Sequence, residues 1–208
     1  MKDIWNDIRK ELRQTSTSFE YLNNIGETIK MYPEFDVDSL SKGQLYSKLW
    51  LIKKLKKIRP YYGNVYLLGG WYAIIAEMLF NNMNIEKIYS FDLDESCGKI
   101  ADEININYVI DNWKFKSFVK NINELDFGDC NTVINTSSEH IKENTWFDNI
   151  PKDTLVVIQS NNLTSIKEHV NCVNDLDELK YKYKLSIIYY QGELDLVSYK
   201  RFMIIGIK

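Results

Sequence analysis

The sequence has few of the features that mark secreted, membrane-spanning or zinc-knuckle proteins. Its three cysteines, Cys97, Cys130 and Cys172, are odd in number and form no Cys-x-x-Cys pair. Neither a disulfide framework nor a structural zinc site is therefore expected. No apolar run is long enough to cross a bilayer, and residues 1–7 include acids instead of the apolar core of a signal peptide. We expect a soluble, cytoplasmic protein with no membrane partner.

An excess of positive charge is also missing. The formal net charge is −3 over 208 residues, which argues against a protein that simply coats nucleic acid, although a local basic surface is compatible with it. Hydrophobic residues make up 45% of the chain, enough for a full core. The length fits one large domain, or one domain with a helical extension.

The first sixty residues have the spacing of amphipathic helices, because apolar residues recur there every three or four positions. The three apolar stripes are Ile4, Trp5, Ile8 and Leu12; Phe19, Leu22, Ile25 and Ile29; and Leu45, Leu49, Ile52, Leu55 and Ile58. A Ser-x-x-Gln pattern at Ser41 and Gln44 caps the third helix, and Pro60 ends it. We predict an N-terminal helical cap over residues 1–60.

From Val65 onward, short apolar runs alternate with helical stretches. The expected strands are 65–68, 87–91, 114–120, 132–135, 154–159, 185–190 and 199–207, and the expected helices are 71–81, 94–107, 140–149 and 174–181. This alternation predicts a parallel sheet with right-handed crossovers. The last connection is too short for a crossover helix, so the last two strands should pair antiparallel. Residues 61–208 are thus predicted to form a three-layer α/β sandwich with a mostly parallel seven-stranded sheet and a C-terminal antiparallel hairpin.

The most informative motif is a pair of glycines after the first expected strand. Gly69 and Gly70 follow residues 65–68, and Asp92 ends the next apolar run. A strand that enters a helix through glycines directs main-chain N–H groups toward a ligand. An acid roughly 20 residues further on is where nucleotide-binding sheets accept ribose hydroxyls. The alternative is a tight turn that binds nothing, with Asp92 as a helix N-cap.

A sheet that ends in an antiparallel hairpin, with Gly69 and Gly70 after its first strand and Asp92 after its second, resembles that of the class I S-adenosylmethionine-dependent methyltransferases. The resemblance covers roughly residues 60–208. It implies a Rossmann-like fold, S-adenosylmethionine as the cofactor, and an enzyme that transfers a methyl group to a small-molecule or nucleic-acid acceptor. The chain departs from the family pattern because its first strand carries no acid and two adjacent glycines replace Gly-x-Gly-x-Gly.

The resemblance also implies where the cofactor binds. In the family the loop after the first strand passes under the methionine part, and the acid that ends the second strand holds the ribose. The residues after the third strand touch the adenine, and the end of the fourth faces the reacting centre. The matching residues are Gly69, Gly70, Trp71, Asp92, Leu93, Asn121, Ile122, Asn135 and Thr136. Two other functions remain open: aminocarboxypropyl transfer from the same cofactor, and an inactive module that binds RNA or a protein.

Two Glu-His pairs supply the candidate catalytic residues. The only histidines follow glutamates, as Glu139-His140 after the fourth expected strand and Glu168-His169 beyond the fifth. In an open parallel sheet both segments lie at the strand ends where ligands bind. A nearby carboxylate orients a histidine and raises its pKa. We therefore assign acceptor orientation and proton removal to Glu139 and His140.

The same residues allow two other interpretations. His140 and His169 with a glutamate form a set that suits a divalent metal, although our assignment includes no metal. Alternatively, Ser137 or Ser138 caps the helix expected at 140–149 and leaves His140 on the surface.

The third helix and the terminal hairpin contain weaker candidates. Ser41, Lys42, Gln44 and Tyr46 are placed to close over a cofactor pocket, as N-terminal helices do in the resembled family. Lys48 and the basic residues at 53–59 make the third helix basic enough to contact phosphates, although such lysines more often form a solvated face. Arg201 is expected to pair with Glu193 across the hairpin.

Overall fold

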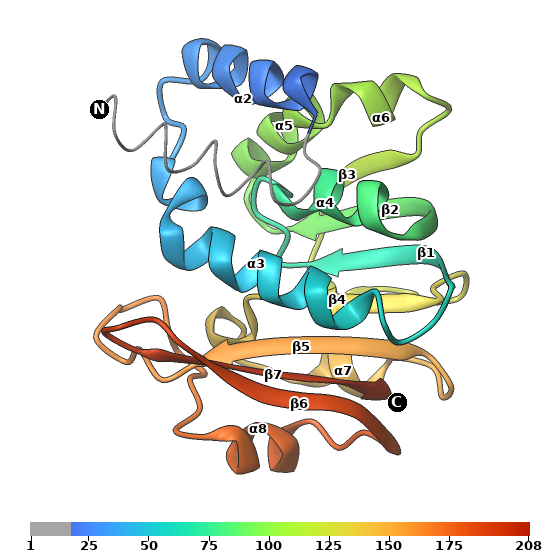
Figure 1. Cartoon of the computed structure of the whole chain (residues 1–208), viewed down its shortest axis with the longest axis vertical. Helices are drawn as coiled ribbons and strands as arrows, with labels where there is room; N and C mark the ends of the chain where they lie inside the picture. Colours follow the sequence, from blue (N-terminus) through green and yellow to red (C-terminus); the bar gives the residue numbers. More distant parts are fainter. Residues whose placement is uncertain (1–17) are drawn as a thin grey trace.

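The computed structural model describes residues 18–208, which form one mixed seven-stranded sheet with helices on both faces (Figure 1). The strands are β1 (Tyr61–Leu68), β2 (Asn84–Asp92), β3 (Phe115–Val119), β4 (Thr132–Asn135), β5 (Leu155–Asn161), β6 (Ile187–Asp195) and β7 (Lys200–Ile207). Their order in the sheet is β3-β2-β1-β4-β5-β7-β6. Only the pairs that involve β7 are antiparallel. The predicted mostly parallel sheet with a terminal hairpin is confirmed.

The helices form two layers with the sheet between them. One layer contains α2 (Phe19–Met31), α3 (Lys42–Leu55), α4 (Ile75–Asn82), α5 (Glu95–Ile104) and α6 (Ile106–Ile110), and the other contains α7 (Thr145–Asp148) and α8 (Leu176–Lys182). Successive strand residues point to opposite faces. Leu67 accordingly packs with the first layer and Leu68 with the second. Within residues 18–208, no helix combines the length and the apolar content needed to cross a membrane.

The N-terminal helices share a core with the sheet. Ser18 caps α2 by accepting a hydrogen bond from the main-chain N–H of Tyr21, which is itself buried. Ser41 caps α3, as the sequence pattern predicts, and its Oγ lies 3.4 Å from the Gln44 nitrogen. β1 begins at Tyr61, directly after the predicted helical cap. The first predicted helix, at Ile4 to Leu12, lies outside the described residues.

Several predicted helices have different limits in the structure. α4 begins at Ile75 instead of residue 71, because Trp71 and Ala73 both have φ of 49°, outside the helical region. The helix predicted over 94–107 is divided at Asn105, whose side chain donates to the Ala101 carbonyl at 2.9 Å. The helix predicted over 140–149 is replaced by the 3₁₀ turn η3 (Ser138–His140) and the short α7. α3 ends at Leu55, before the predicted limit at Pro60.

Gly70 and Gly26 provide a matched test of how closely the chain is packed after β1. A Cβ on Gly70 would overlap the buried hydroxyl of Ser90, whereas a Cβ on Gly26 in α2 would meet no atom within 4 Å. Gly70→Ala should lower the free energy of unfolding by about 1–3 kcal/mol. Gly26→Ala should raise it by about 1 kcal/mol, because alanine favours the helix. Urea unfolding measures both changes, and equal effects of the two variants would contradict the packing described for Gly70.

Candidate functional site

A small cavity lies between the carboxyl ends of β1 and β4. Its wall is formed by Leu67 and residues 69–75 after β1, by Thr136 and Ser137 after β4, and by Ser39, Gln44 and Lys48 from the helical cap. β1 has β2 on one side and β4 on the other. The chain therefore leaves β1 toward one edge of the sheet and later returns to build the other half, and open α/β sheets bind ligands at the place where the strand order reverses in this way. The cavity volume is about 20 Å³, which is room for about one water molecule. A larger ligand requires it to widen.

The turn after β1 is held by hydrogen bonds to β2 and α2. The Gly70 nitrogen donates to the Phe91 carbonyl at 3.2 Å, and the Trp71 nitrogen donates to Oδ2 of Asp92 at 2.9 Å. From α2, the Tyr21 hydroxyl donates to the Ile74 carbonyl at 3.1 Å. Residues with a Cβ rarely have positive φ, and such conformations persist where the surroundings hold them, often at binding sites. The turn is therefore a preorganised wall of the cavity.

Asp92, the predicted ribose acceptor, lies beside this turn. Besides its contact with Trp71, it accepts a hydrogen bond at Oδ1 from the Asp94 nitrogen at 3.2 Å. The N-cap of α5 is Asp94, whose carboxylate accepts from the Ser96 nitrogen at 2.8 Å. Each Asp92 oxygen accepts a single hydrogen bond from the described residues and can accept a second. Asp92 thus both supports the turn and retains capacity for a ligand.

The residues predicted to touch the adenine do not line the cavity. Asn121 caps a 3₁₀ turn, η2 (Ile122–Glu124), by accepting from the Asn123 nitrogen at 3.1 Å, and Ile122 is buried in the core. Leu93 and Val119 are instead the exposed apolar side chains next to Asp92, with 70% and 54% of their surface accessible. Val119 pairs with Asp92 in the sheet. Val119 was not among the predicted residues, because an apolar residue at the end of a strand is usually part of the core.

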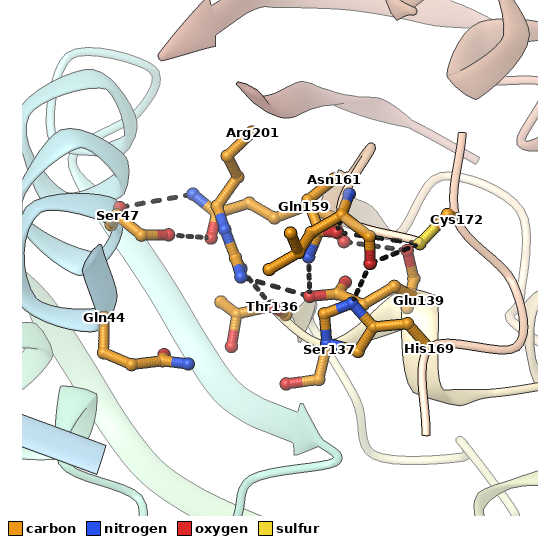
Figure 2. A network of polar contacts seen from close by, with 12 residues as sticks. Gln44, Ser47, Thr136, Ser137, Glu139, Gln159, Asn161, His169, Cys172 and Arg201 are labelled. Atoms are coloured by element: carbon orange, nitrogen blue, oxygen red, sulfur yellow. Dashed lines mark hydrogen bonds and ion pairs between the residues drawn. The ribbon is translucent and has the colours of Figure 1, made fainter. Parts of the chain in front are cut away.

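A buried ion pair joins β7 to the segment after β4 (Figure 2). Nη2 of Arg201 lies 3.1 Å from Oε1 of Glu139, and the two side chains are only 5% and 1% exposed. Nδ2 of Asn161 donates to the same oxygen at 2.6 Å. Nη1 of Arg201 donates to the Thr136 carbonyl at 2.8 Å, which connects the pair to the cavity wall.

The predicted partner of Arg201 was wrong. Glu193 pairs instead with Lys200, at 2.9 Å, and both of these side chains are exposed. Neighbouring residues on a strand point to opposite faces, so Lys200 lies toward solvent while Arg201 lies inside. The inward position gives Arg201 the buried carboxylate of Glu139 as its partner.

Gln159 on β5 links helix α3 to the sheet. Its Oε1 accepts from the Ser47 hydroxyl at 2.7 Å, and its Nε2 donates to the Ser47 carbonyl at 3.2 Å (Figure 2). The Gln159 carbonyl accepts from the Ser138 hydroxyl at 2.7 Å. Ser138 is therefore engaged with β5 and does not cap a helix, contrary to one of the predicted alternatives.

Lys48 is buried against the cavity, contrary to the prediction of a solvated face. Its ammonium group is placed by Gln44, one turn earlier on α3, whose Oε1 accepts from Nζ at 2.8 Å. Burial and, to a lesser extent, the positive charge of Arg201 lower the pKa of Lys48 to about 7, against the opposing charges of Asp38 and Glu139. The amine therefore exists in both protonation states near neutral pH.

A signal for the burial of Lys48 is present in the sequence. Leu45, Lys48, Ile52 and Leu55 are spaced by three or four residues, so they share one face of α3. A lysine inside an apolar stripe departs from the ordinary pattern of an amphipathic helix. The exposed lysines of the same helix region, Lys53, Lys56 and Lys57, do form a solvated face.

His140 and His169 meet beside Glu139. Their ring centroids are 4.5 Å apart and the rings are nearly perpendicular. Nδ1 of His169 is hydrogen-bonded to the Leu163 carbonyl at 2.7 Å. Partial burial lowers the pKa of His140, while the charge of Glu139 acts in the opposite direction. The predicted meeting of the polar segments after β4 and β5 is observed.

Several solved structures similar to this chain are methyltransferases. The N-methyltransferase NodS from Bradyrhizobium japonicum WM9, solved with S-adenosyl-L-homocysteine, aligns over 89% of this chain and 98% of its own, with a TM-score of 0.66 and 8% identity. Geranyl diphosphate C-methyltransferase from Streptomyces coelicolor A3(2), solved with Mg²⁺, geranyl diphosphate and S-adenosyl-L-homocysteine, aligns over 85% and 87%, with a TM-score of 0.61 and 13% identity.

The fold is that of the class I S-adenosylmethionine-dependent methyltransferases. Neighbours with this fold have been crystallised with S-adenosylmethionine or S-adenosylhomocysteine, so S-adenosylmethionine is the cofactor of this fold. No family model and no curated protein matches the chain.

The residues predicted from the class I methyltransferase resemblance fall into two groups. Gly69, Gly70, Trp71 and Thr136 line the cavity, with Asp92 hydrogen-bonded to its wall. The other predicted cofactor-binding residues, Leu93, Asn121, Ile122 and Asn135, do not line it, and neither do Glu139 and His140, the predicted catalytic pair. Of these, Asn135 is fully buried, and its Nδ2 has no hydrogen-bond partner among residues 18–208.

Removal of Arg201 should expose the cost of a buried, unpaired carboxylate. Arg201→Met should lower the free energy of unfolding by about 3–5 kcal/mol, because Glu139 would lose its cationic partner without access to water. The matched control is Lys200→Met. It breaks the exposed ion pair between Glu193 and the residue that precedes Arg201, and it should cost at most about 1 kcal/mol. Urea unfolding compares them, and similar losses would contradict a buried pair.

The burial of Lys48 should be visible as a pH dependence of stability. The unfolded chain keeps an ordinary lysine pKa, whereas the folded pKa is about 7. Below pH 7 both states are protonated and the cost of burying the charge is fully present. Above pH 7 only the unfolded state holds the proton, so the stability of the wild type relative to Lys48→Met should rise toward pH 10, by at most about 1.4 kcal/mol per pH unit. A difference that does not change with pH would contradict the lowered pKa.

Proposed function

We propose that this protein is an S-adenosylmethionine-dependent methyltransferase whose donor binds in the cavity between β1 and β4. The observation that carries the proposal is the rigid turn at 69–74, which lies beside Asp92 at the point where the crossovers of the sheet diverge. The turn and Asp92 lie at the carboxyl ends of β1 and β2, where open α/β sheets bind nucleotide-like ligands and a carboxylate accepts from the ribose.

The ribose and adenine of the donor are assigned to the ends of β2 and β3. Asp92 has one remaining acceptor position on each oxygen, which matches the two hydroxyls of a ribose. Leu93 and Val119 offer exposed apolar surface on either side of it, and an adenine ring would cover that surface. Trp71 lines the cavity next to the turn and is placed to border the donor.

The methionine part of the donor is assigned to the helical cap. Lys48 and Gln44 line the cavity opposite the turn, and a carboxylate entering it would form a charge-assisted hydrogen bond with the protonated amine of Lys48. The cavity has to widen to admit the donor. In the present structure the amine of Lys48 donates a hydrogen bond to Oε1 of Gln44. Replacement of Gln44 by the donor carboxylate would preserve the hydrogen bond of Lys48.

The reaction requires alignment of an acceptor lone pair with the methyl group and removal of a proton from the acceptor. The methyl group leaves the sulfonium as its S–C bond breaks, and the donor becomes a neutral thioether. Oε1 of Glu139 is engaged by Arg201 and Asn161, so Glu139 is placed to position its neighbour. His140 is the member of the predicted pair whose ring is at the surface. Its role toward the acceptor stays a prediction.

Substitution of Asp92 tests the donor site directly. Isothermal titration calorimetry should detect binding of S-adenosylmethionine and S-adenosylhomocysteine to the wild type and no binding of NAD. Asp92→Asn should weaken both adenosyl ligands by about 1–3 kcal/mol, because a ribose hydroxyl would lose an anionic acceptor. Asp148→Asn, which changes an exposed carboxylate on α7, is the matched control and should bind as the wild type does.

The donor assignment would be overturned if neither adenosyl compound bound to the wild type. Unchanged affinity in Asp92→Asn would instead leave the cofactor in place and refute the ribose contact.

A further inference from the structure

Three side chains with metal-ligating atoms converge at the ends of β4 and β5. Glu139, His140 and His169 each bring one candidate ligand atom into a group in which all three atoms lie within 4.8 Å of one another. Glu139 and His140 belong to the turn after β4, and His169 belongs to the loop after β5. Two imidazoles and a carboxylate are a common ligand set for zinc and for iron(II).

The ring of His169 is held in a state suited to a metal ligand. Its Nδ1 is hydrogen-bonded to the Leu163 carbonyl at 2.7 Å, and a carbonyl can only accept, so Nδ1 carries the proton. In the neutral ring Nε2 then has a free lone pair. Metal-binding histidines usually donate their second N–H to a carbonyl or carboxylate in this way. The Leu163 segment is itself fixed, because its nitrogen donates to Oδ1 of Asn161 at 2.9 Å.

Glu139 presents an oxygen that lacks a partner. Arg201 and Asn161 both donate to Oε1, while Oε2 has no hydrogen-bond partner among residues 18–208, although the side chain is only 1% exposed. A buried carboxylate oxygen without a donor is energetically costly. A bound cation at Oε2 would remove that cost, and the two donors at Oε1 would hold the carboxylate in position.

The two loops that carry the ligands are fastened together by Asn171. Its main-chain nitrogen donates to the Glu139 carbonyl at 2.8 Å, and its Nδ2 donates to the carbonyls of Ser138 and Ile141 at 3.3 and 2.7 Å. The distance between the segments is therefore set by the folded chain itself. This preorganisation favours binding, because the ion would not have to order the loops.

We propose that Glu139, His140 and His169 bind one divalent transition-metal ion, for which Zn²⁺ is the probe. Neighbouring ligand atoms of tetrahedral zinc lie about 3.4 Å apart, since each Zn–N bond is about 2.0–2.1 Å long. The two ligand atoms that are farthest apart in the structure therefore have to approach each other by roughly 1.4 Å at most. Rotation of the His140 side chain, which is the exposed member of the set, supplies this movement.

Three protein ligands leave a coordination position for water or for an oxygen of a second ligand. A neutral imidazole has one available nitrogen lone pair. If His140 binds the ion with it, His140 cannot also remove a proton from the methyl acceptor. The metal site does not depend on the methyl donor, because none of its three ligands lines the donor cavity.

Zinc titration of the protein without a histidine tag tests the proposal, since the chain has only two histidines of its own. Calorimetry should show one ion per chain, and Co²⁺ should give the visible absorption of a low-coordinate site. His140→Ala and His169→Ala should each weaken binding at least tenfold. Glu168→Gln, which changes the exposed carboxylate next to His169, should bind as the wild type does.

Two further variants separate the carboxylate and the nearby thiol. Glu139→Gln combined with Arg201→Met removes the third ligand without leaving a buried charge unpaired, and it should weaken binding at least tenfold in protein whose circular dichroism is unchanged. The nearby thiol is that of Cys172, whose Sγ lies 3.7 Å from Oδ1 of Asn161, and Cys172→Ser should have no effect. The proposal is overturned if the wild type binds neither ion, if the histidine variants bind like the wild type, or if Cys172→Ser loses as much affinity as they do.

Discussion

The arrangement of the site depends on the buried carboxylate of Glu139. A charge removed from water is tolerated only with a cationic partner and further hydrogen bonds. The chain supplies these from two different strands, Arg201 on β7 and Asn161 on β5 (Figure 2). The insertion of β7 between β5 and β6 is what brings the guanidinium to this position. One carboxylate thereby fixes the segment after β4 relative to two neighbouring strands.

The same network extends to the proposed donor cavity. Arg201 also donates to the carbonyl of Thr136, which lines the cavity, and Gln159 holds α3 through Ser47. α3 in turn carries Lys48, whose lowered pKa arises from burial and from the charge of Arg201. The proposed donor site and the proposed metal site therefore lie on opposite sides of one polar network. A change in the ion pair should affect both sites.

The sheet was predictable because alternation and length are local properties of the chain. β4 has the predicted limits of residues 132–135, and the hairpin of β6 and β7 follows from a connection too short for a helix. The start of α4 was not predictable, because Trp71 and Ala73 have positive φ, which side chains with a Cβ disfavour. Contacts from segments distant in the sequence, α2 and β2 among them, hold that turn in place.

The sequence by itself determined the order of helices and strands, the glycine turn, the acid after β2 and the polar segments after β4 and β5. The tertiary structure decided which polar side chains are partners. Glu139 and Arg201 are 62 residues apart, and no local rule prefers Glu139 to the nearby Glu193. Desolvation decides between them: Glu193 remains hydrated, whereas Glu139 is buried and requires the cation. Burial of that kind is created only when the distant segments assemble.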